Sequence, residues 1–214
     1  MDYYIEIENL SKVIKKQQIL DHINLHLEKG KIYGFVGRNG SGKSMLFKAI
    51  CGFITPDDGK IMVNGKQIGK DTDFPNSTGA IIEKPGLIPY MTAFENLKTF
   101  ASIRKMIDDE QIRHILELVE LDPNSSKKVR AFSLGMKQRL GIAQAIMENP
   151  ELLILDEPMN GLDREGVEHI KQVIRQMHSN GCTILLSSHI AGDIEELADQ
   201  VFYMDRGVLS ERNE

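Results

Sequence analysis

Alternating polar and apolar residues in the first third of the chain predict a small antiparallel sheet. The alternation covers residues 4–8 and returns over residues 23–28, which is typical of strands with one exposed face. A hairpin is also predicted over residues 61–68, because Asn64-Gly65 at its centre is a strong two-residue turn signal. The strands within the first thirty residues are expected to form a half-exposed antiparallel sheet.

The last third of the chain has a different pattern, with runs that are apolar throughout. Residues 152–155 and 183–186 form two such runs, and a helix is predicted between them over residues 164–179. Continuous apolar strands alternating with helices indicate a parallel sheet covered on both faces. Residues 201–209 then predict a closing hairpin.

Residues between these two blocks are predicted to be helical. Their apolar positions recur at helical spacing, for example Leu97, Phe100 and Ala101, and Pro123 marks a break. The chain is therefore expected to have an α/β fold. Its core would consist of residues 1–89 and 149–214, with residues 90–148 inserted as a helical subdomain.

Composition narrows the possible classes of protein. The chain has 214 residues, of which 41% are hydrophobic and 27% charged, as in ordinary soluble domains. Its net charge of −5, without a large basic field, argues against a nucleic-acid partner. No run approaches the ~18 apolar residues of a membrane span, and acidic residues among the first six argue against a signal peptide. Cys51 and Cys182 stand in apolar surroundings and are expected to be small core residues in a reducing cytoplasm.

A glycine-rich loop between a predicted strand and a predicted helix carries the first candidate chemistry. Residues 37–44, Gly-Arg-Asn-Gly-Ser-Gly-Lys-Ser, match the pattern G-x-x-x-x-G-K-[ST], in which backbone N–H groups and a helix N-terminus surround a polyphosphate. A plain glycine-rich turn is the alternative, but the strand and helix on either side favour nucleotide binding. Lys43 is expected to reach the β- and γ-phosphates, and Ser44 to hold Mg²⁺. The residues expected to bind the nucleotide here are Asn39, Gly40, Ser41, Gly42, Lys43, Ser44 and Met45.

Two adjacent carboxylates follow the apolar run at residues 152–155. Asp156 and Glu157 are placed by this run at the carboxyl end of a buried parallel strand, where ligands bind in such sheets. Because side chains alternate along a strand, the two acids face different ways and can act differently. Asp156 is expected to bind Mg²⁺, largely through water, and Glu157 to orient and polarise the attacking water. A polar strand terminus is the simpler alternative, which the phosphate loop upstream makes less favourable.

Taken together, these and three further motifs resemble the ATP-binding subunits of ABC transporters over essentially the whole chain. Residues 132–139, Phe-Ser-Leu-Gly-Met-Lys-Gln-Arg, are similar to the signature motif of that family. Residues 160–163, Asn-Gly-Leu-Asp, are similar to its D-loop, and Ser187-Ser188-His189 to its switch histidine. The resemblance implies one ABC-type nucleotide-binding domain over residues 1–214, with a P-loop NTPase core, a small antiparallel β subdomain and the helical insert.

Several site roles follow from the resemblance alone. Ser133 and Gly135 would contact the ATP held by a second subunit, so that each chain contributes half of two composite sites. Asp163 would help to connect these two sites. A lone histidine at a strand end is commonly only a polar cap, but the motif implies that His189 bonds the γ-phosphate and the attacking water.

Four residues, in three motifs, depart from the commonest family pattern. Glu83 stands where most members have a glutamine, and its carboxylate could coordinate Mg²⁺ while adding negative charge beside the phosphates. Ile14 stands where an aromatic ring often stacks on adenine, so modest ATP affinity and weak base selectivity are expected. Leu134 and Met136 replace a glycine and a glutamine of the signature motif. Residues 82–87 and 133–138 together resemble the bacitracin-resistance and lantibiotic-immunity branch of bacterial exporters.

The resemblance therefore implies an ATP-hydrolysing motor subunit that uses ATP and Mg²⁺. It would form a homodimer when ATP is bound and join separate transmembrane permease subunits, which would hold it at the inner face of the cell membrane. An ATP-gated clamp without transport and a nucleotide-binding regulatory subunit are the alternatives. The residues that either line an apolar groove for the permease or belong to the core of the insert are Leu87, Tyr90, Phe94 and Leu97.

Overall fold

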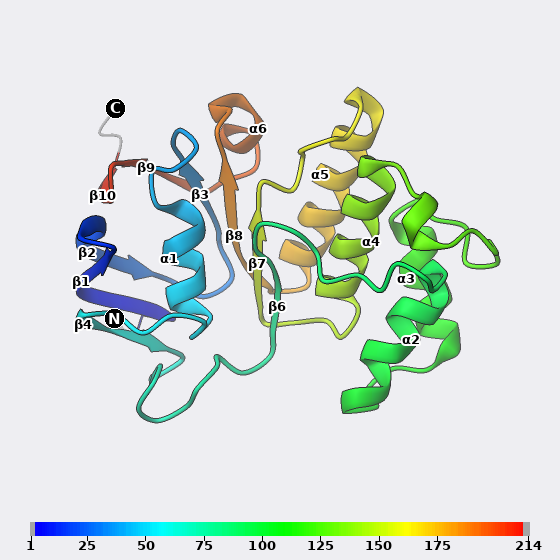
Figure 1. The fold of residues 1–214 in the computed structure, drawn as a ribbon, viewed down its shortest axis with the longest axis horizontal. Helices are drawn as coiled ribbons and strands as arrows, with labels where there is room; N and C mark the ends of the chain where they lie inside the picture. Colours follow the sequence, from blue (N-terminus) through cyan, green and yellow to red (C-terminus); the bar gives the residue numbers. More distant parts are fainter. Residues whose placement is uncertain (1–2, 212–214) are drawn as a thin grey trace.

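The computed structural model describes residues 3–211, apart from the side chain of Asp193 (Figure 1). Met1 and Asp2, part of the run that bears on a signal peptide, lie outside the described residues. The strands are β1 (Ile5–Ile14), β2 (Gln17–Leu27), β3 (Ile32–Val36), β4 (Asp58–Val63), β5 (Lys66–Gln67), β6 (Thr78–Ile81), β7 (Leu152–Asp156), β8 (Thr183–Ser188), β9 (Gln200–Asp205) and β10 (Val208–Glu211). The helices are α1 (Lys43–Ile50), α2 (Ala93–Arg104), α3 (Asp109–Leu118), α4 (Leu134–Ile146), α5 (Arg164–Ser179) and α6 (Ala191–Glu195), with a 3₁₀ turn over Val129–Ala131.

The larger sheet places the ends of three central strands side by side. Its order is β10-β9-β3-β8-β7-β6, and every neighbouring pair is parallel except β10 with β9. The strands β3, β7 and β8 are buried along their whole length, as their continuous apolar runs predict. The segments that follow these three strands therefore leave the same edge of the sheet.

The strands β3, β7, β8 and β9 divide their side chains between two cores. On β3, Tyr33 and Phe35 belong to the core shared with α1 and the antiparallel sheet, whereas Ile32 and Val36 belong to the core on the other face, where α6 contacts the strand. This division follows from the two-residue period of a strand, which sends successive side chains to opposite faces. In Figure 1, α1 lies between the two sheets, and α4 and α5 cover the other face of the larger sheet.

The antiparallel sheet predicted near the start of the chain is confirmed, with the order β2-β1-β4-β5. Both long strands, β1 and β2, extend beyond the alternating stretches. Bulges interrupt the register between them, for example between Ile7 and Leu10. The bulges keep the apolar side chains of β1 on the buried face although the sequence alternation is broken. The turn at Asn64-Gly65 joins β4 to β5 as predicted, and both residues have positive φ angles.

The segment predicted to be helical contains α2 and α3, and each of these helices begins at a capping box. The helix α2 begins with a capping box between Thr92 and Glu95, and α3 begins with one between Asp108 and Gln111. Figure 1 places α2 and α3 at the side of the molecule farthest from the antiparallel sheet. Among residues 3–211, no helix combines the length and the apolar composition that a bilayer crossing requires. Cys51 and Cys182 are buried as predicted, and burial raises the pKa of each thiol to about 12.

Two short elements, β6 and α6, are absent from the sequence-based prediction. The strand β6 is only Thr-Gly-Ala-Ile, and glycine weakens strand propensity, so tertiary contacts decide its structure. A Cβ on Gly79 would lie 1.8 Å from the carbonyl oxygen of Ala145, which shows how closely the backbone of α4 approaches β6. The absence of a side chain at Gly79 therefore allows α4 to pack this close to the sheet.

We expect Gly79→Ala to lower the free energy of unfolding by at least about 2 kcal/mol, because the new methyl group must push α4 away from β6. Urea unfolding followed by circular dichroism measures this change. The matched control is Gly192→Ala, since a Cβ at Gly192 meets no atom within 4 Å. Equal stability of the two variants would contradict the close packing of α4 on β6.

Candidate functional site

The glycine-rich loop joins β3 to α1 and packs against the strand β2 of the antiparallel sheet. Gly42 has a φ of 116°, and a Cβ there would lie 2.9 Å from the carbonyl oxygen of Ile19 on β2. Only glycine combines this backbone conformation with so close an approach. The loop thus keeps its curved shape, and Lys43 follows it as the first residue of α1.

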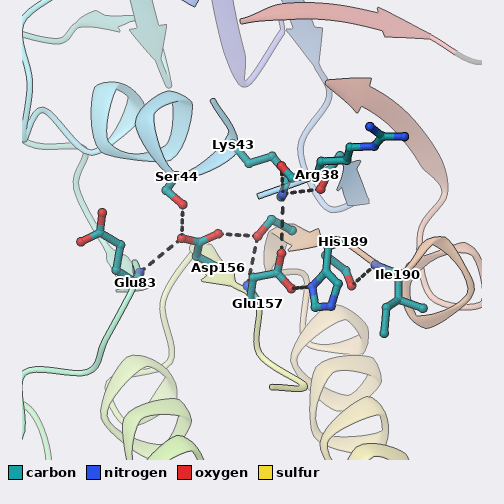
Figure 2. Close-up of polar contacts among 11 residues, drawn as sticks. Arg38, Lys43, Ser44, Glu83, Asp156, Glu157, His189 and Ile190 are labelled. Atoms are coloured by element: carbon teal, nitrogen blue, oxygen red, sulfur yellow. Dashed lines mark hydrogen bonds and ion pairs between the residues drawn. The ribbon is translucent and has the colours of Figure 1, made fainter. Parts of the chain in front are cut away.

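Lys43 lies inside the curve of the loop and is 5% exposed. Its ammonium donates hydrogen bonds to the carbonyl oxygens of Gly37 and Arg38, at 2.6 and 3.3 Å. The same ammonium lies 3.6 Å from Oε1 of Glu157, as Figure 2 shows. A buried cation is therefore held between the loop and a carboxylate of the neighbouring strand end, where it suits a phosphate group.

Asp156, the last residue of β7, accepts hydrogen bonds from three separate segments. Ser44 Oγ donates to its Oδ2 at 2.5 Å, and Ser187 Oγ on β8 donates to its Oδ1. The backbone N–H of Glu83 also donates to Oδ2, at 3.2 Å. Asp156 is only 4% exposed, so these donors compensate for the cost of burying a charged group.

Glu157 follows directly but lies beyond the end of β7, so its left-handed backbone, and not the strand alternation expected from the sequence, sets the direction of its side chain. Its φ of 53° turns the chain sharply, and its backbone N–H bonds Ser187 Oγ at 3.0 Å. Oε2 of its carboxylate is 2.8 Å from Nδ1 of His189 (Figure 2). Oε1 is buried and accepts no hydrogen bond from the described part of the chain, although Lys43 is near. A buried carboxylate oxygen with free acceptor capacity is able to bind a water or another donor.

Ser44 and Asp156 fit a magnesium site, whereas Glu83 takes part through its backbone. Hydroxyl and carboxylate oxygens are the ligands that Mg²⁺ prefers, and these two oxygens are already in contact. The carboxylate of Glu83 instead accepts from Lys48 Nζ at 2.5 Å. Figure 2 shows the Glu83 side chain pointing away from Asp156. A metal role for the Glu83 carboxylate stays a prediction.

The residues of the signature motif and the D-loop lie close to each other and away from the glycine-rich loop. Ser133 caps α4, its Oγ accepting from Met136 N at 3.2 Å, and Asp163 caps α5, its carboxylate accepting from Gly166 N at 2.9 Å. Ser133, Gly135 and Asp163 line one cavity of about 720 Å³. No hydrogen bond among the described residues joins these three to the glycine-rich loop.

Leu134, the residue that replaces a signature glycine, packs on the D-loop of its own chain. A Cβ on Gly161 would lie 2.5 Å from the Leu134 side chain, so the two residues are in close contact. Leu134 is nevertheless 66% exposed. The substitution therefore links the signature motif to the D-loop and leaves an apolar side chain at the surface.

Ile14 lies at the end of β1, in the hairpin that β1 forms with β2. It is 38% exposed and its neighbour Val13 is 43% exposed, so both offer apolar surface. The contact of Ile14 with adenine stays a prediction. Among the candidate groove residues, Leu97 is fully buried and belongs to the helical core, whereas Tyr90 is 68% exposed. Leu87 and Phe94 are partly buried against the same core.

Sequence reasoning missed three residues that support the site. Ser187 pairs in register with Asp156 across β8 and β7 and bonds both carboxylate residues. Gln138, which is 8% exposed, donates to the backbone oxygen of Glu157 at 3.4 Å. Lys48 pairs with Glu83. A serine at the end of an otherwise apolar strand was a usable signal, whereas the other two contacts depend on how the helices pack.

Comparison with known proteins gives one consistent family. The profile of the family described as ABC transporter matches residues 20–160. The chain is 47% identical over 205 residues to the uncharacterized ABC transporter ATP-binding protein YybJ of Bacillus subtilis, covering 96% of this chain and 94% of YybJ. It is 43% identical over 213 residues to the bacitracin transport ATP-binding protein BcrA of Enterococcus faecalis, covering 99% and 69%. It is 38% identical over 205 residues to the lantibiotic transport ATP-binding protein SrtF of Streptococcus pyogenes, covering 96% and 88%.

Solved structures agree with this family in fold. An ATP-binding subunit of an ABC transporter is 28% identical, with a TM-score of 0.85 over 97% of this chain and 90% of that one. The ATP-binding cassette MJ0796, in a dimeric post-hydrolysis state bound to ADP and phosphate, is 21% identical, with a TM-score of 0.85 over 98% and 100%. The fold predicted from the sequence, an ABC-type core with an antiparallel sheet and a helical insert, is thereby confirmed.

We expect Ser187→Ala to lower the free energy of unfolding by about 1–3 kcal/mol, because Asp156 and the backbone N–H of Glu157 each lose a buried partner. Chemical denaturation of the purified chain measures the change. Ser102→Ala is the control, since Ser102 is exposed on α2 and bonds only a carbonyl of its own helix. Unchanged stability of Ser187→Ala would show that Asp156 does not need this donor.

Proposed function

The chain belongs to the ABC transporter family, and from this premise we propose that it is the ATP-hydrolysing subunit of a bacterial exporter for peptide antibiotics. Its family and its site support an ATPase whose turnover drives transport. The export of bacitracin-like or lantibiotic-like peptides is the finer part of the proposal. It is supported by the similarity to BcrA and SrtF, whose names refer to bacitracin and lantibiotic transport.

The state of the Glu157 carboxylate carries the hydrolytic part of the proposal. Its Oε1 is buried, has no hydrogen-bond donor among the described residues and faces the Lys43 ammonium at 3.6 Å. Its Oε2 is held by His189 at 2.8 Å. Oε2 is thus fixed in position, while Oε1 can still accept a hydrogen bond from a water beside the phosphate loop. That arrangement suits a group that orients and polarises an attacking water.

Phosphate binding is assigned to the loop and the first turn of α1. Backbone N–H groups of Asn39 to Met45 would surround the phosphates, because glycines let the chain approach closely and the helix N-terminus attracts anions. Lys43 would exchange its bonds to the loop carbonyls for bonds to the β- and γ-phosphates. Ser44 and Asp156 would hold Mg²⁺, which when bound neutralises charge on the phosphates, and Glu83 is a further candidate ligand.

His189 is assigned a catalytic role next to Glu157. The imidazole is 39% exposed and reaches the carboxylate through Nδ1, so its other nitrogen remains available. That nitrogen would bond the γ-phosphate or the attacking water. The short helix α6 follows immediately and connects the histidine to the rest of the sheet. Movement of this segment would therefore change the contact between His189 and Glu157.

A second copy of the chain would complete each site. Ser133 and Gly135 lie at the N-terminus of α4, where the helix dipole and free N–H groups suit the γ-phosphate of a partner's ATP. They line a cavity away from the glycine-rich loop of their own chain, so a partner would have to provide that loop. Asp163, at the start of α5, would connect the two sites. Ile14 would contact adenine by aliphatic packing.

Transport would require permease subunits encoded separately, with this subunit attached to them at the inner face of the membrane. Co-expression with the membrane protein of a neighbouring gene should give co-purification and raise the minimal inhibitory concentration of a bacitracin-like or lantibiotic-like peptide. An active ATPase without either result would support an ATP-gated clamp that does not transport. A chain that binds ATP without turnover would support a regulatory subunit.

We expect Glu157→Gln to reduce ATP hydrolysis by at least about 100-fold, because the amide cannot act as a base toward the attacking water. ATP binding should persist, and size-exclusion chromatography in ATP should show a stabilised dimer. Phosphate release measures the turnover.

Glu110→Gln is the matched control, since Glu110 is exposed in the first turn of α3 and lies outside the site. It should hydrolyse ATP at the parental rate. Parental turnover in Glu157→Gln would overturn the assignment of Glu157 as the residue that activates water.

A further inference from the structure

Glu83, the residue that departs from the common family pattern, is paired with a lysine of α1. Lys48 Nζ lies 2.5 Å from Oε1 of Glu83. The side chain of Lys48 is 24% exposed and that of Glu83 is 61% exposed. Exposed ion pairs of this kind contribute little to the stability of a fold. The effect of this pair is therefore to be sought in the charge and position of the Glu83 carboxylate.

The backbone of Glu83 lies at the magnesium ligands, although its carboxylate does not. Its N–H donates to Oδ2 of Asp156 at 3.2 Å, and the same oxygen accepts from Ser44 at 2.5 Å. Glu83 has a φ of 65°, a left-handed conformation that is uncommon outside glycine. This conformation directs the N–H toward Asp156 while the side chain leaves in another direction, as Figure 2 shows.

Lys48 is placed to receive that side chain because it shares a helix with Ser44. Residues four apart in a helix lie on the same face one turn from each other. Ser44 bonds Asp156 from the first turn of α1, and Lys48 reaches Glu83 from the next turn. A single helix thus supplies both the hydroxyl for the site and the cation that holds Glu83 outside it.

Without this cation, a second carboxylate would be free to approach Asp156. Two like charges close together raise the energy of the site, and each further negative charge repels the phosphates of a nucleotide. The carboxylate of Glu83 stays within one side-chain length of Asp156, since the Glu83 backbone N–H donates to Asp156. Pairing with Lys48 neutralises the charge and removes the carboxylate from the ligand oxygens.

We propose that Lys48 is a positioning residue that holds the Glu83 carboxylate away from Ser44 and Asp156 and so sets how strongly nucleotide binding depends on Mg²⁺. This inference rests on the proposed ATP-binding function. With the ion pair intact, the phosphates of ATP are repelled by the carboxylate of Asp156 but not by that of Glu83, whose charge Lys48 neutralises. With the pair broken, ATP without metal would meet both carboxylates, whereas bound Mg²⁺ would compensate for them.

The test compares the Kd of a fluorescent ATP analogue in Mg²⁺ and in EDTA. In EDTA, Lys48→Met should bind about fivefold more weakly than the parental protein, the size expected for one unpaired charge near a solvated site. In Mg²⁺ the loss should be smaller, so that the ratio of the two Kd values rises. Lys48→Arg should keep the parental ratio because it retains the ion pair.

A second substitution separates positioning from a structural role. Adding Glu83→Gln to Lys48→Met removes the charge that Lys48 holds, and should return the Kd in EDTA to within about twofold of the parental value. Lys60→Met is the control, since Lys60 pairs with Glu8 on the antiparallel sheet at 2.9 Å and its loss changes the net charge equally. Thermal melting checks that each variant is folded, and Lys48→Gln replaces Lys48→Met if the latter is not.

Three results would overturn the inference alone: an unchanged Kd ratio in Lys48→Met, a loss that persists in the double variant, or an equal loss in Lys60→Met. A parental protein that does not bind the ATP analogue would overturn the proposed function and this inference with it. Weakened binding of Lys48→Met in EDTA, together with its recovery in the double variant, would support the role of Lys48.

Discussion

The buried carboxylate of Asp156 is the interaction on which the rest of the site depends. It is an anion at the end of a fully buried strand, and burial of a charge is costly unless hydrogen-bond donors surround it. The donors come from α1, β8 and the segment after β6. One charged group thereby accepts hydrogen bonds from the helix after the phosphate loop, from β8 and from the segment that contains Glu83. A displacement of any of these segments would therefore alter a hydrogen bond of Asp156, the proposed metal ligand.

Glu157 shows the opposite arrangement, although it is the next residue. Its backbone is firmly held by Ser187 and Gln138, yet one carboxylate oxygen is left without a hydrogen bond among the described residues. The surrounding structure therefore fixes the position of the side chain while keeping part of its bonding capacity unused. A preorganised group of this kind can act on a bound water without first breaking an existing bond.

Two of the departures from the common family pattern are accompanied by local contacts. Glu83 has an ion pair with Lys48, and Leu134 packs on Gly161 in the same chain. In both cases a residue that is unusual in charge or size has found a partner on a neighbouring element. The unusual residues are thus integrated into the fold, and their consequences concern how the site is coupled to the segments around it.

The sequence by itself determined the parts of the fold and site that depend on neighbouring residues. The phosphate loop, the adjacent acids Asp156 and Glu157 after an apolar run, and the continuous apolar strands are all local patterns. Helix α5 was predicted with the bounds that the structure has. Contacts between distant segments were decided only by the tertiary structure. Ser44 meets Asp156 across 112 positions, and Lys48 meets Glu83 across 35, because the order of strands in the sheet brings these segments together. The strand β6 belongs to the same class, since its four residues carry too weak a pattern and the packing of α4 on Gly79 places it.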